Sequence, residues 1–426
     1  MKPTTYAVIL AGGIGRRFKP FQQSKPLFPI QGSTLIGRNV EKLLAAGIKD
    51  IVIVTNPADE VLLRPLFFDT KTVRLVIQAN PYGMANALLS VENIVGEGAM
   101  LVLNAADQVE QSLFDEMASC MKKHQAFVVG RQQKTYFNGG YLVVKNSILQ
   151  SIVEKPGEGK QPSDLVNLVF HYFPVASVFI GLIKKQKSES DDHYEQALNK
   201  MAKTTAFAVI KYKGYWQPVK YPWDILTLSQ ALLESELKPK IETRQIAKSA
   251  IIDKNVYLGP GVIVHEHAVI KGPSYVGPFS VIGNHAFVRQ SYIGSDCVIG
   301  TGSEVARSYI GDHSWLHQNY VGDSVLESNV AMGAGSVIAN FRLDEQPVFF
   351  RIDNQKMNTG KTHLGAIIAS DVRIGVEVAI MPGVKIGHNS IVGPGSIVGE
   401  DIGRFTRVFV KPNLKKIPFK GTISKR

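Results

Sequence analysis

The residues best placed to do chemistry gather in the first thirty positions, where an apolar run ends in a glycine-rich turn. The run Tyr6–Leu10 predicts a buried strand, and three glycines follow it between positions 12 and 15. Such a turn lets the backbone approach a ligand closely and gathers N–H groups into one concavity that favours phosphate. Arg17 and Lys25 add two cations beside it. A tight connection without a ligand is the alternative interpretation.

This turn differs from two widespread phosphate-binding loops. It does not fit the GxGxxG pattern, and no Gly-Lys-Ser/Thr follows as in a Walker loop. The segment LAGGIGRRFKPFQQSKPLFPI, residues 10–30, instead resembles the matching segment of sugar-1-phosphate nucleotidylyltransferases, with Arg16 and Ser24 as departures. The resemblance implies that the glycine loop holds nucleotide phosphates, that Arg17 stabilises the leaving pyrophosphate and that Lys25 contacts the transferred phosphate. The NTP-binding residues that it implies are Leu10, Ala11, Gly12, Gly13, Gln78, Gly83 and Met84.

A carboxylate suited to magnesium follows a second apolar run. Asp107 comes shortly after Met100–Asn104, which predicts another strand. Carboxylate oxygens, together with substrate phosphates, are common ligands of Mg²⁺ in phosphoryl-transfer sites. Taken alone, an aspartate after a strand is more often a turn former or a helix cap. The resemblance implies that Asp107 is catalytic and binds the metal, with Mg²⁺ as the cofactor.

Three further residues match the family's contacts to the sugar phosphate. Gly140 lies in a glycine turn, Glu154 opens the sequence Glu-Lys-Pro, and Asn167 follows. The resemblance implies that Glu154 hydrogen-bonds sugar hydroxyls and that Gly140 and Asn167 complete the sugar-phosphate site. Taken alone, the Glu-Lys-Pro sequence is an ordinary exposed turn, so the match depends on the order in which the motifs arrive.

One departure from the family falls on a residue that would bind metal, at position 218. The run GYWQPVKYPWD, residues 214–224, has Pro218 where the family has an aspartate that binds a second metal ion. Proline offers no side-chain ligand, and Asp224 is suited to capping the following helix. Either Asp107 and the phosphates alone hold Mg²⁺, or Lys220 supplies positive charge at this place. Diminished or absent transferase activity is the further alternative.

These residues need a scaffold, and residues 1–236 predict an α/β domain. Apolar runs alternate with helical segments, of which residues 34–46 are the first and residues 223–236 the last. Continuous apolar strands separated by helices favour a Rossmann-like, mainly parallel sheet with helices on both faces and ligands at its carboxyl edge. The predicted strands are Tyr6–Leu10, Ile51–Thr55, Val73–Gln78, Met100–Asn104 and Ala126–Gly130.

A charged linker, residues 237–248, leads to a different pattern. From Ile252 an aliphatic residue recurs every six positions as far as Val288, and with some shorter spacings to Ile338. The repeat is interrupted between Phe341 and about Ala366, and then resumes. A six-residue period predicts a parallel β-helix over residues 249–412, followed by a basic tail, residues 413–426.

The predicted coil contains residues suited to acyl transfer. His317, Tyr320 and Asn340 lie in segments that resemble the acetyltransferase half of bifunctional N-acetylglucosamine-1-phosphate uridylyltransferases and their archaeal relatives. The resemblance implies a left-handed coil that assembles as a homotrimer. It implies that His317 is the base that deprotonates a sugar amine and that Tyr320 and Asn340 bind the sugar phosphate. It further implies acetyl-CoA as co-substrate, beside Ala334 and Pro394.

The match within the coil is incomplete. Ala331 stands where the family has asparagine, and Gln346 and Phe349 stand where it has basic residues. Under one interpretation Arg342 or Arg351 replaces the missing charge. Under the other, phosphate binding is weakened and the coil is a scaffold only.

Composition narrows the classes of partner. A chain of 426 residues, 45% hydrophobic, is long enough for two globular domains, and a net charge of +12 suits anionic small substrates. Lys and Arg are scattered, which argues against a nucleic-acid partner. No apolar stretch is long enough to span a membrane. Cys120 and Cys297 have no metal-binding spacing and fit a reducing, cytoplasmic environment.

Three functional hypotheses follow. In the first, the chain is a bifunctional enzyme that acetylates an amino-sugar-1-phosphate and couples a sugar-1-phosphate to an NTP, with UTP as the first choice. In the second, only nucleotidyl transfer occurs, and the coil serves trimerisation or effector sensing. In the third, a catalytically silent subunit binds sugar nucleotides and regulates a partner. The sequence leaves the identity of the sugar and of the base open.

Overall fold

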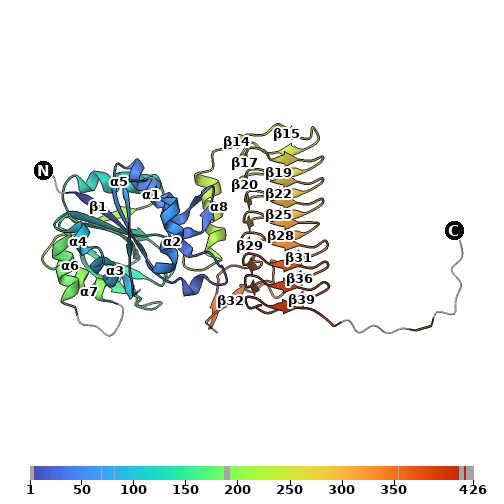
Figure 1. Cartoon of the computed structure of the whole chain (residues 1–426). Helices are drawn as coiled ribbons and strands as arrows, with labels where there is room; N and C mark the ends of the chain where they lie inside the picture. Colours follow the sequence, from blue (N-terminus) through green and yellow to red (C-terminus); the bar gives the residue numbers. More distant parts are fainter. Residues whose placement is uncertain are drawn as a thin grey trace. The chain divides into compact units, whose positions relative to one another are not determined.

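The computed structural model describes residues 4–68, 70–80, 82–186, 192–353, 355–411 and 417–418. They belong to two compact units, Met1–Glu236 and Leu237–Arg426, of which the first is an α/β domain and the second a coil of short strands (Figure 1). The predicted basic tail, residues 413–426, lies almost wholly outside the described residues. Within the part of the chain described, no helix is both long and apolar enough to cross a membrane.

The first unit is built on one nine-stranded sheet with the order β5-β4-β1-β6-β11-β8-β12-β10-β9. The strands β5, β4, β1 and β6 pair in parallel, as do β8 and β12. The strands β11 and β10 run antiparallel to their neighbours, so the sheet is mixed although most of its strands point the same way. The strands are β1 (Thr5–Ala11), β4 (Asp50–Thr55), β5 (Val73–Ile77), β6 (Ala99–Asn104), β8 (Phe127–Gln132), β9 (Gly140–Lys145), β10 (Ile148–Glu154), β11 (Leu165–Phe173) and β12 (Ala208–Tyr212).

Helices cover both faces of this sheet (Figure 1). Along β1, Ala7 and Ile9 enter one hydrophobic cluster with α1 and α5, while Val8 enters the opposite cluster with α3, α6 and α7. Burial on both faces is the reason that the strands are continuously apolar. The helices are α1 (Leu35–Ala45), α2 (Pro57–Leu66), α3 (Gly83–Leu89), α4 (Glu92–Val95), α5 (Gln111–Met121), α6 (Ala176–Lys184), α7 (His193–Ala202) and α8 (Asp224–Ser235).

Short elements complete the first unit at the carboxyl edge of the sheet. The 3-10 helices Arg16–Phe18 and Lys25–Leu27 follow β1, and the strand pairs β2 (Pro29–Ile30) with β3 (Ser33–Thr34) and β7 (Asp107–Val109) with β13 (Trp216–Pro218) lie apart from the main sheet. Because Leu10 pairs with Asn104, the glycine turn after β1 and the turn after β6 meet at this edge. The fold therefore brings residues 12–17 and Asp107 to one place.

The second unit is a coil whose strands stack in three parallel sheets, consistent with the predicted left-handed parallel β-helix. The first sheet contains β14 (Lys240–Ile241), β17 (Val256–Leu258), β20 (Ser274–Val276), β23 (Tyr292–Ile293), β26 (Tyr309–Ile310), β29 (Val325–Leu326), β34 (Ile367–Ile368) and β37 (Lys385–Ile386). The second contains β15 (Gln245–Ile246), β18 (Ile263–Val264), β21 (Val281–Ile282), β24 (Val298–Ile299), β27 (Trp315–Leu316), β30 (Ala331–Met332), β35 (Arg373–Ile374), β38 (Ile391–Val392) and β40 (Arg407–Val408). The third contains β16 (Ile251–Ile252), β19 (Val269–Lys271), β22 (Phe287–Arg289), β25 (Glu304–Ala306), β28 (Tyr320–Gly322), β31 (Val337–Ile338), β36 (Ala379–Ile380) and β39 (Ile397–Val398).

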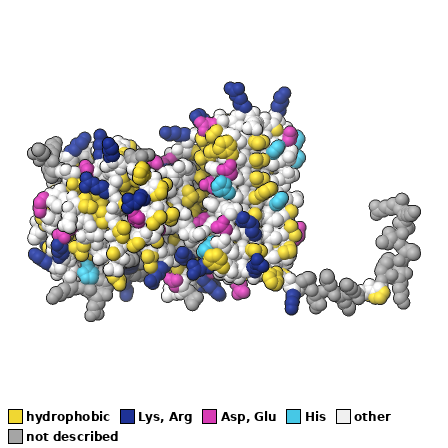
Figure 2. Space-filling model, viewed as in Figure 1, with side chains coloured by type: hydrophobic (Ala, Val, Ile, Leu, Met, Phe, Trp, Pro, Cys, Tyr) yellow, Lys and Arg dark blue, Asp and Glu magenta, His cyan; other side chains and the backbone are white. Residues whose placement is uncertain are grey.

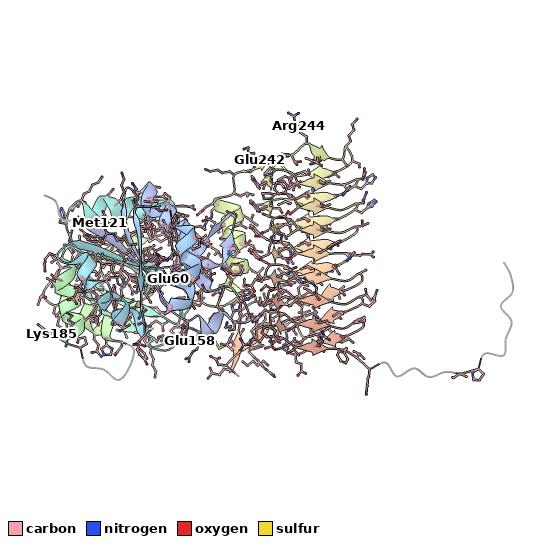
Figure 3. All side chains as sticks on the ribbon, in the orientation of Figure 1. Glu60, Met121, Glu158, Lys185, Glu242 and Arg244 are labelled. Carbon is pink, nitrogen blue, oxygen red and sulfur yellow. The ribbon has the colours of Figure 1, made fainter. Side chains whose placement is uncertain are left out.

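The start of the coil differs from the sequence prediction. Residues 237–248 are not a free linker, because β14 pairs with β17 and β15 pairs with β18. Glu242 accepts a hydrogen bond of 2.6 Å from the Tyr257 hydroxyl, which ties this segment to the next winding. Glu242 and Arg244 accordingly lie at one end of the coil (Figure 3). The first winding therefore begins at Lys240.

The interruption of the repeat is a hairpin inserted between two windings. It consists of β32 (Phe349–Ile352) and β33 (Gln355–Asn358), which pair antiparallel. The windings on either side still stack, because β29 pairs directly with β34. The insertion therefore adds a projecting element without breaking the coil.

Hydrogen bonds between windings satisfy polar groups inside the coil. The Oγ atoms of Ser274, Ser291 and Ser308 each accept a bond from the backbone N–H of the next member of the column, which ends at Ser324. All four side chains are buried. Since a buried polar group without a partner is costly, the column explains how serine is tolerated beside the aliphatic core.

Stacked aromatic rings mark the outside of the first sheet of the coil. The rings of Tyr257, Tyr275, Tyr292 and Tyr309 follow one another with centroid distances of 4.8, 4.9 and 4.7 Å. This is the spacing of neighbouring strands in a sheet, so equivalent residues of successive windings contact one another directly. Hydrophobic side chains also form a row along the visible face of the coil (Figure 2).

Candidate functional site

The first unit contains a cavity of about 540 Å³ at the carboxyl edge of the sheet. Arg17, Lys25 and Asp107 all line it. The sequence motifs therefore converge on one site although they are spread over about a hundred residues. The cavity is also lined by all of the predicted NTP-binding residues, which are Leu10, Ala11, Gly12, Gly13, Gln78, Gly83 and Met84.

Backbone conformation in the glycine turn suits close approach of a ligand. Gly15 has a φ of +61°, in the left-handed region that side chains rarely adopt, and it directly precedes the 3-10 helix that carries Arg17. A Cβ atom on Gly12 would lie 2.2 Å from Oε1 of Gln78. Glycine at position 12 therefore lets the Gln78 amide pack against the loop.

Gln78 is held by its own neighbours. Its Nε2 donates hydrogen bonds of 2.8 Å to Asn86 Oδ1 and 3.3 Å to the Gly83 carbonyl oxygen. Both N–H groups of the amide are thus used within the protein, and the side chain is 3% exposed. The group that Gln78 can offer to a ligand is its carbonyl oxygen, an acceptor. Asn86 is a positioning residue that the sequence did not reveal.

Asp107 is the carboxylate of this cavity. Trp216 Nε1 donates to its Oδ2 at 3.3 Å. Burial raises the pKa of the Asp107 carboxyl, whereas the Trp216 hydrogen bond and the charges of Lys25 and Lys220 lower it. For the Lys25 ammonium the direction is the opposite: burial lowers its pKa, and the negative charge of Asp107 is the main influence that raises it. A site that partly buries a carboxylate and ammonium groups is suited to a strongly charged ligand that compensates them.

The backbone around Asp107 is fixed by a side chain from α1. The Asn39 amide, which is fully buried, donates to the carbonyl oxygens of Ala105 at 3.0 Å and Asp107 at 3.2 Å. Gln108, also buried, donates to the carbonyl oxygen of Leu35 at 2.9 Å. These three bonds anchor the turn between β6 and β7 on α1. No local pattern in the sequence predicts these contacts.

The residues can hold Mg²⁺ only with help from a ligand. Among the described residues, no group of three or more His, Cys, Asp or Glu side chains could hold a metal ion. Pro218 lies directly opposite Asp107 in the β13–β7 pair and supplies no ligand. Mg²⁺ is often bound through one or two carboxylates together with substrate phosphates. The single carboxylate of Asp107 fits that mode.

Lys220 contributes a third cation beside Arg17 and Lys25. Its Nζ donates to the Asn138 carbonyl oxygen at 2.7 Å and lies 3.8 Å from the centroid of the Phe137 ring. Burial lowers the pKa of the Lys220 ammonium to about 8; the charge of Asp107 raises it, and that of Arg17 lowers it further. Lys220 also lines the cavity.

The sequence-based expectation that Asp224 caps the following helix is wrong: Asp224 is the first residue of α8, Trp223 is at the N-cap position, and among the described residues no side chain caps this end of the helix. Asp224 Oδ2 accepts hydrogen bonds of 2.7 Å from the backbone N–H groups of both Lys220 and Tyr221. The carboxylate thereby fixes the turn that leads from β13 into α8. The same contacts hold the backbone of Lys220 in place.

The three predicted sugar-phosphate residues of the first unit lie together, outside the lining of the cavity. Gly140 pairs with Glu154 between β9 and β10, and a Cβ atom on Gly140 would lie 2.9 Å from Glu154 Oε2 and 3.4 Å from Asn167 Cβ. Asn167 Oδ1 accepts from His171 Nε2 at 2.9 Å, and Tyr194 Oη lies 2.7 Å from His171 Nδ1. Burial lowers the pKa of His171 to about 3, so this ring is neutral and orients Asn167.

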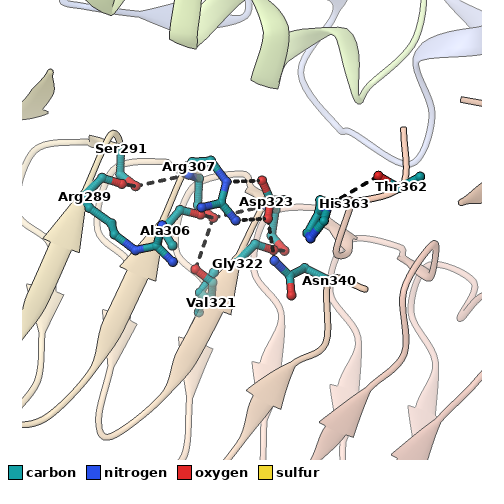
Figure 4. Close-up of polar contacts among 12 residues, drawn as sticks. Arg289, Ser291, Ala306, Arg307, Val321, Gly322, Asp323, Asn340, Thr362 and His363 are labelled. Carbon is teal, nitrogen blue, oxygen red and sulfur yellow. Dashed lines mark hydrogen bonds and ion pairs between the residues drawn. The ribbon is translucent and has the colours of Figure 1, made fainter. Parts of the chain in front are cut away.

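In the coil, Tyr320 and Asn340 are joined by a hydrogen bond. Tyr320 Oη donates to Asn340 Oδ1 at 3.3 Å, and Asn340 Nδ2 donates to the Asp323 carboxylate. Arg307 in turn binds Asp323 through two bonds of 2.7 and 2.6 Å (Figure 4). This chain of contacts fixes the amide of Asn340 from one side. A Cβ atom on Gly322 would lie 2.6 Å from Tyr320 Oη and 2.7 Å from Asn340 Nδ2, so the arrangement requires glycine there.

His317, Ala334 and Pro394 lie along one corner of the coil. His317 follows β27 directly, while Ala334 and Pro394 each lie two residues beyond β30 and β38 of the same sheet. The His317 ring is exposed and stacks on Trp315 with a centroid distance of 5.5 Å. The structure thus joins Tyr320 to Asn340, and it gives the described His317 side chain no hydrogen bond to either.

The positions that depart from the family in the coil also have defined surroundings. Ala331 pairs with Trp315 between β30 and β27. Arg342 forms an ion pair with Asp344, which raises the pKa of the guanidinium and lowers that of the Asp344 carboxyl to about 2. The Gln346 backbone N–H donates to the same carboxylate. Lys356 Nζ lies 4.3 Å from the centroid of the Phe349 ring, and Lys385 Nζ donates to the Arg351 carbonyl oxygen.

Comparisons with known proteins agree with both units. The family model described as Nucleotidyl transferase matches residues 6–235. A protein of Sulfurisphaera tokodaii named bifunctional sugar-1-phosphate nucleotidylyltransferase/acetyltransferase is 32% identical over 411 residues, covering 93% of this chain and 98% of that protein. The bifunctional protein GlmU of Methanococcus vannielii is 28% identical over 418 residues, covering 96% of this chain and 98% of the relative.

Among solved structures, apo UDP-glucose pyrophosphorylase is similar with a TM-score of 0.47 and 19% identity, over 55% of this chain and 99% of that one. The family model covers more than half of the chain, and the two relatives match it along almost its whole length. The chain therefore belongs to the nucleotidyl transferase family and matches its bifunctional relatives through both units.

Proposed function

We propose that the first unit transfers a nucleotidyl group from an NTP to a sugar-1-phosphate and releases pyrophosphate. The observation that carries this proposal is the convergence of Arg17, Lys25 and Asp107 on one cavity with the glycine turn. In the reaction, a phosphate oxygen of the sugar-1-phosphate forms a bond to the α-phosphorus. The bond from that phosphorus to the bridging oxygen breaks, and pyrophosphate leaves with the negative charge.

The chain's own residues supply positioning and charge. The glycine turn receives the phosphates, Arg17 neutralises the departing pyrophosphate, and Lys25 contacts the transferred phosphate. When bound, Mg²⁺ supplies further neutralisation of phosphate charge, and Asp107 is the residue that would hold it. The carbonyl oxygen of Gln78 is able to accept a hydrogen bond from the ring N–H of uracil or thymine. UTP is therefore the first NTP to test.

The test is pyrophosphate release by the purified protein with Mg²⁺, across four NTPs and a panel of sugar-1-phosphates. Turnover with one pair, lost in the Asp107→Asn variant, supports the proposal and identifies the substrates. A folded protein that releases no pyrophosphate with any pair would contradict it. That outcome would favour a subunit that binds sugar nucleotides without converting them, which the proline opposite Asp107 also motivates.

We further propose that the coil transfers an acetyl group from acetyl-CoA to the amine of an amino-sugar-1-phosphate. The amine nitrogen forms a bond to the thioester carbonyl carbon, the bond to sulfur breaks, and the amine proton passes to a base. His317 is exposed, precedes Tyr320 by three residues and is the candidate base. Ala334 and Pro394 lie on the same corner and would contact acetyl-CoA.

The acetyl-transfer proposal is tested by thiol release from acetyl-CoA with glucosamine-1-phosphate and galactosamine-1-phosphate. The His317→Asn variant is expected to lose thiol release and to retain nucleotidyl transfer. His313→Asn is the matched control, because His313 is another exposed histidine at a corner of the coil. Equal loss in both variants would contradict a specific role for His317.

A homotrimer is the assembly that we propose for the coil. What supports it is the apolar outward side of the second sheet, where Ile263, Val281, Val298 and Trp315 occupy equivalent positions in successive windings. Trp315 is exposed and the other three are partly exposed, and apolar rows at a protein surface commonly mark interfaces. Light scattering on the eluting protein measures the mass. A monomer at micromolar concentration would contradict the proposal.

A further inference from the structure

Lys220 has a more constrained position than an ordinary surface lysine. Its backbone N–H donates to the Asp224 carboxylate at 2.7 Å, so the start of the side chain is fixed. At the other end, Nζ lies over the Phe137 ring and donates to the Asn138 carbonyl oxygen. Most exposed lysines lose conformational entropy when they bind a ligand. A lysine that is already held at both ends loses less.

This position lies between the two groups of predicted substrate contacts. Lys220 lines the cavity with Arg17 and Lys25 on the nucleotide side. The residue that its Nζ binds, Asn138, is two positions before Gly140, and Gly140 packs against Glu154 on the sugar side. The ammonium therefore lies between the predicted nucleotide contacts and the predicted sugar contacts. The group that joins these two parts of the substrates is the phosphate of the sugar-1-phosphate.

The charge balance of the cavity favours an anion at this place. Among its described lining residues, Arg16, Arg17, Lys25 and Lys220 are cationic, and Asp107 is the single carboxylate. The position opposite Asp107 is Pro218, which adds no negative charge. The net charge of these residues is positive. It suits a ligand whose phosphates carry more negative charge than one metal ion neutralises.

We propose that Lys220 is a catalytic residue that binds the phosphate of the sugar-1-phosphate directly and holds it for attack on the α-phosphorus. This inference rests on the proposed nucleotidyl transfer and names a residue that the family resemblance does not assign. Lys220 keeps its proton throughout. The bond formed is from the acceptor phosphate oxygen to the α-phosphorus, the bond broken is from the α-phosphorus to the bridging oxygen, and pyrophosphate carries the charge away.

The experiment compares Lys220→Met, Lys220→Arg and the control Lys213→Met, which removes an exposed lysine from the same unit. Binding is measured by calorimetry without turnover, first with Mg²⁺ and α,β-methylene-UTP, and then with glucose-1-phosphate and N-acetylglucosamine-1-phosphate added to that complex. Kinetic constants are measured in parallel with the pair found in the pyrophosphate assay. Thermal unfolding of each variant reports whether the unit remains folded.

The expected result is selective. Lys220→Met should weaken sugar-1-phosphate binding and raise its KM by at least about tenfold, with binding of the UTP analogue changed less than about threefold. Lys220→Arg should recover part of the affinity, and Lys213→Met should behave as the unaltered chain. Unchanged sugar-1-phosphate binding in Lys220→Met would overturn the inference, and so would a loss confined to the UTP analogue.

These outcomes separate the inference from the proposed function. If the unaltered chain turns over a substrate pair and Lys220→Met does so equally well, nucleotidyl transfer stands and only the role of Lys220 is overturned. If the unaltered chain neither releases pyrophosphate nor binds either sugar-1-phosphate, both proposals are overturned together.

Discussion

Pro218 lies directly across from Asp107 in the two-stranded pair formed by β13 and β7. In an antiparallel pair, opposed residues have neighbouring side chains, so a ligating group at position 218 would lie beside the Asp107 carboxylate. The chain has a ring there that can bind no metal, and a lysine two residues later lines the same cavity. The position therefore offers a direct way to alter metal binding.

The Pro218→Asp variant should bind divalent cations more tightly than the unaltered chain. A second carboxylate beside Asp107 completes the pair of ligands that Mg²⁺ commonly uses. We expect the Mg²⁺ concentration for half-maximal pyrophosphate release to fall by about tenfold, the effect of about 1.4 kcal/mol. Gln217→Asp is the matched control, because adjacent strand residues face opposite sides. Similar shifts in both variants would mean that added charge alone is responsible.

The Asp107→Asn variant should lose nucleotidyl transfer while its fold is retained. The substitution removes the charge but keeps the size and an acceptor for Trp216 Nε1. We expect a fall in kcat of at least about a hundredfold, because a charged group that acts on the transferring phosphate is lost. Asp115→Asn, on the exposed side of α5, is the control. Activity within a few fold of the unaltered chain would exclude a role for Asp107 in catalysis.

The Gly322→Ala variant should separate the two activities. Its Cβ would lie 2.6 Å from Tyr320 Oη and 2.7 Å from Asn340 Nδ2, so both side chains must shift. We expect acetyl transfer to be lost and nucleotidyl transfer to be unchanged, with a stability cost of about 1–3 kcal/mol in the coil.

Gly399→Ala is the control for that substitution. It lies in the same coil, and a Cβ atom there would have nothing within 4 Å. Rates of thiol release and of pyrophosphate release, measured on the same preparations, check the prediction. Normal acetyl transfer in Gly322→Ala would show that the Tyr320–Asn340 arrangement is dispensable.

The stability of the first unit should fall in mild acid because of His171. Its folded-state pKa of about 3 lies below the unfolded value of 6.5, so the unfolded chain takes up a proton first. The contribution of the neutral His171 ring to the free energy of unfolding is complete above pH 6.5, and it is lost as the pH falls from 6.5 towards 3. Between pH 7.5 and pH 5 the loss is about 2 kcal/mol.

The measurement is urea unfolding followed by tryptophan fluorescence in a Trp315→Phe background. Of the three tryptophans, Trp216 and Trp223 then remain, and both belong to the first unit. His171→Gln keeps a polar group near Asn167 but removes the titration, so its free energy of unfolding should depend less on pH over this range. Equal pH dependence in both proteins would contradict the assignment.

The six-residue repeat begins before residue 249, where the sequence predicted the start of the coil. Ile246 packs against the core of the coil and lies six residues before Ile252, so the period extends further back than residue 249. The charged residues around it hid this signal. Short strands at the end of a coil keep few inward aliphatic side chains, because only one face of the first winding is covered.

The sequence alone determined the elements whose pattern is local. The continuous apolar runs of β1, β4, β5, β6 and β8, the glycine turn and the six-residue period each follow from neighbouring residues that must be buried or must turn. The order of the motifs also placed Arg17, Lys25 and Asp107 in segments that follow β1 and β6 at one edge of the sheet, and the cavity is lined by all three.

The tertiary structure alone decided which side chains support those residues. Asn39 reaches the carbonyl oxygens around Asp107, and Lys220 reaches Asn138 across 82 positions of chain. Such contacts depend on how β6, β7, β13 and α1 converge, and no local pattern of residue types records that convergence. A hydrogen bond needs two groups within about 3 Å. Spacing along the sequence fixes that distance within one helix or turn, but only the packed fold fixes it between elements.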